Sequence, residues 1–236
     1  MKHSLRPTKI SIAIALIFSL QSIQSFTQST HLKPIVVEVN SNFNYGKSNS
    51  TLQQYKKDLT GVLAGVSFQA GITPIFSIVT ETYFTMKGAA LKADNPVTVN
   101  KSKLRLYNAE IPVLARLHLK HFYINAGPYF SYMIGGSLKT DGSKEVPEIS
   151  TAITFHNVAN GFKHWEMGLQ AGAGYNFRIK RTILALDLRY GYGLTNISQD
   201  AEKYNRTFNI SCIAFKPWKT NPFARKVEPN HQIVIK

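Results

Sequence analysis

The sequence predicts an all-β fold, an eight-stranded antiparallel up-and-down barrel, and three observations lead to it. Apolar and polar residues alternate strictly over long runs, as they do in strands, whose successive side chains point to opposite faces of a sheet. Eight such runs lie between residues 33 and 215. The connections between them are alternately short and long, so tight turns gather at one end and long loops at the other. A chain of 236 residues can form one such barrel.

The clearest run is WEMGLQAGAGYNF, residues 165–177. Every second residue from Trp165 to Phe177 is apolar or aromatic, and the residues between them are Glu, Gly, Gln and Asn. A helix would scatter these residues around its circumference, so the run predicts a strand with two unlike faces. We expect the three glycines of its polar face to act as spacers inside a narrow barrel.

Seven further runs show the same alternation, and the last is the least regular: residues 35–45, 61–72, 76–88, 105–119, 122–134, 182–194 and 206–215. Tight turns are predicted at residues 71–74, 120–121 and 180–181. The long connections, all polar, are residues 46–58, 89–103, 135–162 and 195–204. Both ends of the barrel sequence then lie on the side of the short turns.

The first 25 residues have the layout of a secretory signal peptide. Lys2, Arg6 and Lys9 precede an apolar segment, residues 10–20, that is too short to span a bilayer as a helix. We expect cleavage between residues 22 and 28, which implies export. The single cysteine, Cys212, excludes an internal disulfide and is expected to be a small apolar residue of the wall.

The net charge of +15, which falls to +12 without the three basic residues of the signal peptide, is spread along the chain. No basic helix, zinc-ligand spacing or RNA-binding aromatic motif accompanies it, so nucleic acid is not an expected partner. A basic surface suits anionic lipid headgroups and lipopolysaccharide phosphates better. No apolar run of about 18 residues follows the signal peptide, which excludes a helical membrane protein but leaves a membrane β-barrel open.

The polar faces decide between a soluble and a membrane barrel. A soluble barrel needs an exterior rich in Lys and Glu, whereas these faces carry small residues and isolated charges of both signs. They suit a lumen in which the charges pair as a structural network: Glu38, Glu81, Lys87, Glu110, Arg116, Glu166, Arg178, Asp187 and Arg189. Strands of about 12 residues tilted by about 45° cover nearly 30 Å, the thickness of a bilayer core. A transmembrane barrel is therefore predicted.

Aromatic residues near the strand ends agree with a membrane setting. Outer-membrane barrels carry aromatic girdles at both interfaces with water. The residues expected in such girdles are Tyr107, Phe122, Trp165, Tyr175, Phe177, Tyr190 and Tyr192.

The segments YNAEIPVLARL, NAGPYFSYMIGG, EMGLQAGAGYNF and LALDLRYGYGLTNI, preceded by ETYFTMKG, occur in an order and spacing that resemble the PorT-type outer-membrane β-barrel family of Gram-negative bacteria. The likeness covers residues 35–215 and brings no catalytic residue with it. It implies an eight-stranded barrel in the bacterial outer membrane, in a family of largely unassigned function with one branch linked to protein secretion. One departure is the basic tail, residues 216–236, which follows Phe215, where a last strand would usually end.

Three kinds of function remain after these exclusions. The favoured one is non-enzymatic, with a structural or interaction role and outer-membrane lipid, lipopolysaccharide or another envelope or secretion protein as partner. A lipid-modifying enzyme could use Ser150, His164 and Glu166 near the outer rim. A narrow channel could use the charges of 110, 116, 187 and 189 as a constriction, although side chains fill the lumen of an eight-stranded barrel. No cofactor or metal site is expected, because the seven histidines lack ligand spacing.

Overall fold

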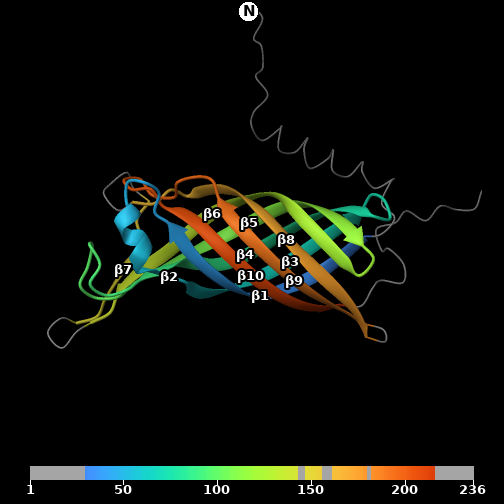
Figure 1. Ribbon diagram of the computed structural model, residues 1–236, viewed down its shortest axis with the longest axis horizontal. Coiled ribbons are helices and arrows are strands. Elements are labelled where there is room, and N and C mark those ends of the chain that lie inside the picture. Colours follow the sequence, from blue (N-terminus) through green and yellow to red (C-terminus); the bar gives the residue numbers. More distant parts are fainter. Residues whose placement is uncertain (1–29, 143–146, 156–160, 180–181, 216–236) are drawn as a thin grey trace, which may run out of the picture.

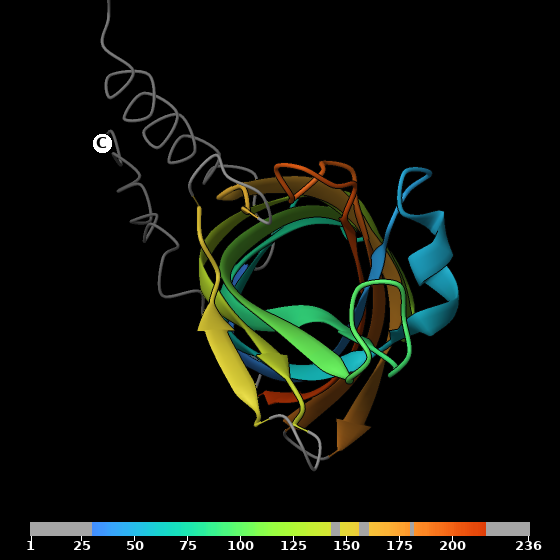
Figure 2. The ribbon, with the colours of Figure 1, turned by 90° about the vertical axis from the view of Figure 1, so that its left-hand side faces the viewer.

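A computed structural model of the chain describes residues 30–142, 147–155, 161–179 and 182–215, and in it eight long antiparallel strands close into a barrel (Figures 1 and 2). The expected signal peptide, residues 1–25, and the basic tail, residues 216–236, lie outside the described residues. The predicted fold class is confirmed. The strands are β1 (Thr30–Asn44), β3 (Leu59–Gly71), β4 (Phe76–Leu91), β5 (Ser102–Leu119), β6 (Phe122–Thr140), β8 (Trp165–Ile179), β9 (Thr182–Gly193) and β10 (Tyr204–Phe215).

Each strand pairs with its neighbours in the chain, and the barrel closes where β1 meets β10. The paired residues define the stagger of the barrel. A circuit of partners that starts at Thr30 returns to β1 ten residues further on, at Asn40, by way of Ala70, Ile78, Ala115, Ala126, Ala171, Tyr190 and Phe208. Eight strands with this shear tilt by roughly 40° to the axis and leave an interior just wide enough for side chains.

The end with the long connections carries further structure. A 3-10 helix, η2 (Ser50–Tyr55), lies beside the outer end of the wall, the short strand β2 (Lys56–Lys57) pairs with the end of β4, and β7 (Ile149–Ala152) pairs with the end of β6 (Figures 1 and 2). The expectation of plain loops at 89–103 and 135–162 is wrong in part, because β4, β5 and β6 continue into them. Backbone pairing such as Leu104 with Leu138 sustains these extensions without strict polar–apolar alternation. In the ranges described above, no helix is long and apolar enough to cross a bilayer.

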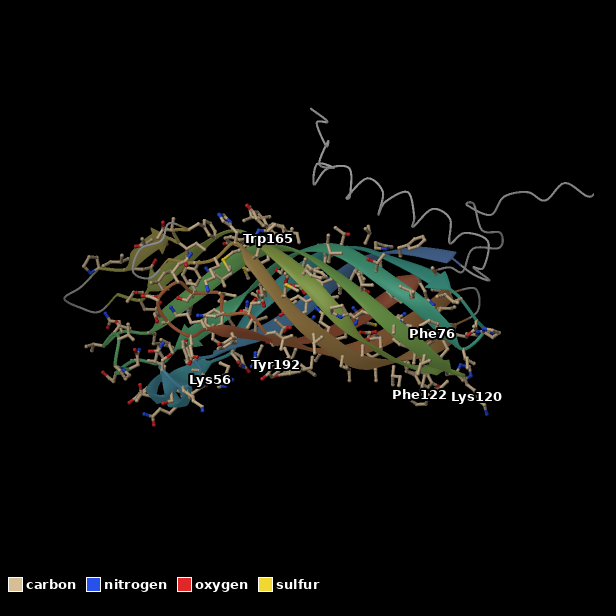
Figure 3. The ribbon with its side chains drawn as sticks, turned by 90° about the horizontal axis from the view of Figure 1, so that it is seen from above. Lys56, Phe76, Lys120, Phe122, Trp165 and Tyr192 are labelled. Carbon is tan, nitrogen blue, oxygen red and sulfur yellow. The ribbon has the colours of Figure 1, made fainter. Side chains whose placement is uncertain are left out.

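The outward face of the wall is an apolar belt with aromatic rings near both rims. Trp165 and Tyr192 lie at one level along the long axis, whereas Phe76 and Phe122 lie near the opposite end (Figure 3). Trp165 is 67% exposed and Phe122 59% exposed, as lipid-facing side chains of an isolated barrel must be. Five more predicted girdle residues are on the outward face: Tyr107, Tyr175, Phe177, Tyr190 and Tyr192.

Strand β1 has the opposite orientation to the one expected. Ile35, Val37 and Val39 are buried in the lumen, while Glu38 is exposed on the outside of the wall, so its placement in the lumen network was wrong. Directly paired residues share a face of a sheet, and Glu38 pairs with the outward-facing Val62 and with residue 210. The register with both neighbouring strands therefore decides which side chains of β1 point into the lumen, and the position of its apolar residues does not.

The glycines of β8 make room for side chains of the neighbouring strands. A Cβ atom at Gly168 would collide with the ring of Tyr129, and one at Gly174 would collide with the ring of Tyr123. Both tyrosines belong to β6 and pair directly with these glycines. Their rings lie against the bare backbone of β8, which directs their hydroxyl groups into the lumen. The glycines are thus spacers, as expected, and each accommodates a particular neighbour.

The substitution Gly174→Val should destabilise the barrel, because a branched side chain there overlaps the ring of Tyr123 and forces it off its place. We expect a loss of about 1–3 kcal/mol, typical of overpacking, seen as a lower temperature at which the folded, fast-migrating gel band disappears. Ala173→Val is the matched control, because that neighbour points outward and is exposed. Equal behaviour of both variants would contradict the packing role of the glycine.

Candidate functional site in the lumen and at the outer rim

The outer half of the lumen is organised around a single buried lysine. The Lys87 ammonium group lies 2.8 Å from a carboxylate oxygen of Glu110 and 2.8 Å from one of Glu166. Strands β4, β5 and β8 supply these three residues, so the cluster ties together strands that are distant in sequence. The other carboxylate oxygens accept hydrogen bonds from the hydroxyl groups of Tyr83 and Tyr129, at 2.9 and 2.7 Å, and from the amide group of Gln170. The amide group of Asn205 donates to the Glu166 oxygen that also binds Lys87.

The inner half holds a second cluster, centred on Arg189. Its guanidinium group pairs with Glu81, with one contact of 2.9 Å, and with Asp187 at 2.6 Å. Arg116 lies 3.8 Å from the same aspartate and donates to Gln69, while its guanidinium carbon is 4.1 Å from the centre of the Tyr123 ring. The Tyr123 hydroxyl donates to Asp187 at 2.6 Å. Side chains from five strands, β3, β4, β5, β6 and β9, thereby converge on four charged groups.

The structure thus brings together seven of the nine predicted lumen charges, all of them buried: Glu81, Lys87, Glu110, Arg116, Glu166, Asp187 and Arg189. In the lumen, four carboxylates face three basic groups. Glu38 is the first exception: it lies on the outer surface, and a fifth carboxylate in the lumen would have increased the excess of negative charge. Arg178 is the second exception. Although it has the inward parity of β8, it is exposed near the end of the strand, so its assignment to the network was also wrong.

An apolar cluster lies beyond the lysine centre, toward the outer mouth. Phe43, Leu106, Met133, Phe162 and Ile197 are buried there together. They come from three strands and from the connections that precede β8 and β10. The mouth with the long connections is therefore closed by packed side chains, and the charged network beneath it is shielded from that side.

Two of the outer connections are joined by a carboxylate. Glu202 accepts hydrogen bonds from the backbone amides of Lys47 and Ser48, at 2.8 and 3.1 Å, and from the Ser48 hydroxyl group. These donors, Ser48 first, lower the pKa of the Glu202 carboxyl below its ordinary value. Because the charged form is the one bound, the link holds at neutral pH and is lost as the pH falls through that lowered pKa.

The residues considered for lipid chemistry are not arranged as a catalytic set. The Nδ1 atom of His164 lies 2.9 Å from the carbonyl oxygen of Met133, and its ring stacks between those of Tyr132 and Phe155. Glu166 points into the lumen toward Lys87, and Ser150 is exposed on β7. Among the described residues, no group of three or more His, Cys, Asp or Glu side chains is placed to hold a metal ion.

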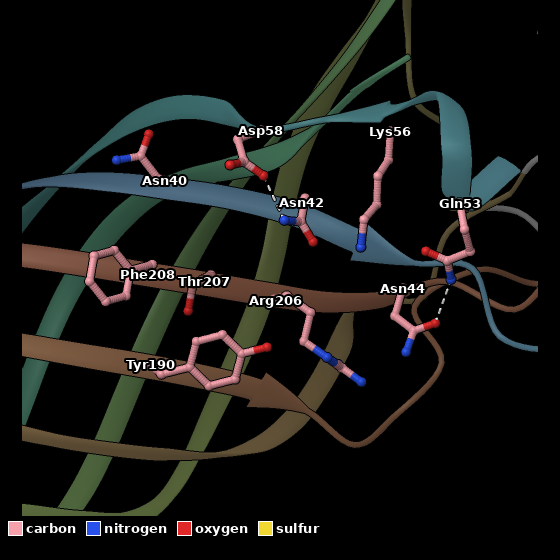
Figure 4. A pocket seen from close by; sticks show the side chains of 10 residues that line it. All are labelled: Asn40, Asn42, Asn44, Gln53, Lys56, Asp58, Tyr190, Arg206, Thr207 and Phe208. Atoms are coloured by element: carbon pink, nitrogen blue, oxygen red, sulfur yellow. Dashed lines mark hydrogen bonds between the residues drawn. The ribbon is translucent and has the colours of Figure 1, made fainter. Parts of the chain in front are cut away.

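Sequence reasoning assigned Gln170 to the polar face of its strand but missed three other neutral members of the network, Tyr83, Tyr123 and Asn205. Their signal was parity, because each lies on the inward face of its strand, a face that Tyr83 shares with Glu81. It also missed a polar pocket on the outside of the wall, lined by residues of β1, β9, β10 and the 45–58 connection (Figure 4). That pocket could not be found without the orientation of β1.

Replacing Lys87 with methionine should cost about 3–5 kcal/mol of stability, because two buried carboxylates lose their shared cation. Denaturant titration followed by the folded gel band measures this loss. Lys139→Met is the control: it removes a pair of similar length, 2.8 Å to Glu148, in which both side chains are partly exposed, and it should cost no more than about 1 kcal/mol. A similar small effect at both positions would show that the lumen network contributes little.

A match to a protein-family model agrees with the membrane setting. Residues 24–199 match the family model "Outer membrane protein beta-barrel domain". A comparison with curated protein sequences finds no significant match. Similar solved structures include Ail of Yersinia pestis in complex with the heparin analogue sucrose octasulfate (10% identity, TM-score 0.42, 80% of this chain and all of that one), Neisserial surface protein A (9%, 0.43, 81% and all) and OprG of Pseudomonas aeruginosa (11%, 0.42, 82% and 99%). The chain belongs to the outer-membrane β-barrel domain family, and it is a protein of the bacterial outer membrane.

Proposed function

We propose that the chain is a non-enzymatic outer-membrane protein that acts through contacts at its outer end, with the barrel as an anchor. The observation that carries this proposal is the filled lumen. Buried ion pairs occupy its length, packed apolar side chains close its outer mouth, and the space beside Glu81 and Arg189 is about 20 Å³. A cavity of that size holds about one water molecule. Such an interior favours an anchor over a channel.

The connection between β4 and β5 offers a contact surface. Val97 and Val99 are 71% and 74% exposed at its tip. The Asn95 side chain accepts hydrogen bonds from the amides of Val97 and Thr98, and Asp94 donates its amide to the carbonyl of Val99, so the tip is held in one shape. Two apolar side chains on an ordered tip suit a protein partner, since pre-organisation lowers the entropic cost of binding. The PorT-type resemblance makes a component of protein secretion the first partner to test.

Conductance measurements test the closed lumen. We expect the protein inserted in planar bilayers to give no discrete current steps, because an ion would have to displace the salt bridges of Lys87 and Arg189. Recovery of the folded gel band from the bilayer sample is the control for insertion. Current steps whose preference for cations over anions changes in Lys87→Met would instead establish a pore through the lumen.

Photo-crosslinking in cells tests the contact surface. A photoreactive amino acid at Val97 should give one discrete protein adduct, which mass spectrometry identifies, and Val99→Asp in the same chain should reduce that adduct several-fold. The matched control carries the photoreactive group at the exposed Thr151 of β7 and should not give this adduct. Absence of any protein adduct at 97 in folded, surface-exposed protein would contradict the proposed role of the tip.

A further inference from the structure

The outward face of β1 interrupts the apolar belt of the wall. Because Ile35, Val37 and Val39 point inward, Glu38 and three asparagines, Asn40, Asn42 and Asn44, point outward. Apolar or aromatic neighbours on the same outer surface are Val62, Tyr190, Phe208 and Ile210. Two direct neighbours are polar: Thr60 donates a hydrogen bond to the side-chain oxygen of Asn40 at 2.9 Å, and Arg206 pairs with Asn42. Burying an amide group in hydrocarbon without a hydrogen-bond partner costs several kcal/mol, roughly. The amide hydrogens and oxygens that these neighbours leave unpaired therefore need a polar partner from outside the wall.

The height of the stripe indicates which part of the membrane it meets. Asn40 pairs with Phe208, and Phe208 pairs with Tyr190. Tyr190 precedes Tyr192 by two residues near the end of β9. Tyr192 lies at the level of Trp165, and Lys56 lies further out than Tyr192 along the barrel axis (Figure 3). In an outer-membrane barrel the long connections face the outside of the cell. The stripe and the residues around it therefore meet the headgroup region of the outer leaflet.

The chain covers part of this stripe with its own 45–58 connection. The side-chain amide of Gln53 donates to Asn44 at 2.8 Å, and that of Asn42 donates to Asp58 at 2.6 Å. Between this cover and the wall remains a half-open pocket of about 650 Å³ (Figure 4). The amide oxygen of Asn42 is buried there and has no hydrogen-bond partner among the described residues.

Two cations line the pocket. Figure 4 shows the side chain of Lys56 extending from the connection toward β1, whereas the side chain of Arg206 leaves β10 on the side of β9. Arg206 is only 8% exposed; its guanidinium carbon lies 3.5 Å from the centre of the Tyr192 ring, and it donates to the carbonyl groups of Gly193 and Asn205. In the part of the chain that the structure describes, no salt bridge involves either cation. Asp58 is the one carboxylate among the residues that line the pocket.

From this geometry we propose that the pocket binds the phosphorylated sugar headgroup of an outer-leaflet glycolipid, the lipid A part of lipopolysaccharide. The phosphate pairs with Lys56 and Arg206, because charge-assisted hydrogen bonds to phosphate are the strongest that these side chains make. The sugar hydroxyl groups form hydrogen bonds with the side-chain amides of Asn40 and Asn42. The acyl chains lie along the apolar outer face of the wall, toward the centre of the membrane. The occupant is a membrane lipid, since the pocket opens from the wall at the level of the headgroups.

Binding is measured on the folded protein in nanodiscs that contain increasing fractions of lipid A, by native mass spectrometry of the retained lipid. We expect the double variant Lys56→Gln/Arg206→Gln to bind lipid A at least tenfold more weakly than the unmodified chain. Lys103→Gln/Lys139→Gln removes two basic groups elsewhere at the outer end and should leave binding unchanged. All variants are first checked for the folded gel band.

A second variant keeps the test decisive if the double variant folds poorly. Asp58→Asn removes the one negative charge of the pocket and should strengthen lipid A binding several-fold, whereas Asn40→Asp adds a negative charge and should weaken it to a similar extent. Unchanged affinity in both of these variants would overturn the proposal. Equal binding of lipid A that lacks its phosphates would do the same.

Two further outcomes identify a different occupant and also overturn the proposal. Displacement of lipid A by inorganic phosphate or by a soluble phosphorylated sugar at equal concentration would make the pocket a site for free anions. Formation of a disulfide-linked dimer by Asn40→Cys in a Cys212→Ser background, unaffected by lipid A, would make the stripe an interface between two copies of the chain.

Discussion

The structure depends on the neutralisation of charge inside a narrow barrel. Eight strands with a shear of ten leave an interior that side chains must fill, and any charged group there has lost its water. Lys87 and Arg189 each meet this requirement by binding two carboxylates supplied by other side chains of the wall. Because the partners come from β4, β5, β8 and β9, the two clusters also link strands that do not pair directly, such as β4 with β8 and with β9.

The same constraint explains two features that look unrelated in the sequence. The glycines of β8 leave its inner surface bare, so the rings of Tyr123 and Tyr129 can lie against it and donate their hydroxyl groups to Asp187 and Glu166. The reversed orientation of β1 places aliphatic side chains, such as Val37, beside the network. Aliphatic side chains suit this side of the lumen. The buried carboxylates already outnumber the buried cations, and the outward position of Glu38 keeps a further negative charge out of the lumen.

The proposed function rests on the filled interior. Because ion pairs fill the lumen and an apolar cluster closes its outer mouth, we propose that other molecules are bound at the outer surface. Two surfaces are available there, the ordered tip at Val97 and Val99 and the polar stripe on β1 with its cations Lys56 and Arg206. The first suits a protein partner and the second suits a phosphorylated lipid. A barrel that binds a particular lipid beside its wall would hold its loops at a defined height above the membrane surface.

The sequence by itself determined the number and order of the strands, the membrane setting and most of the lumen charges, because alternation with period two is a local property that register does not change. It placed seven lumen residues correctly from parity alone, including Glu110 and Arg116. Tertiary structure decided the features that depend on contacts between strands. Pairing of β1 with β3 and β10 places Glu38 on the outer surface and the apolar residues of β1 in the lumen. Arg178 is exposed because it lies near the end of its strand. The continuation of β4, β5 and β6 beyond the predicted strands and the pocket of Arg206 likewise depend on contacts between segments far apart in the chain.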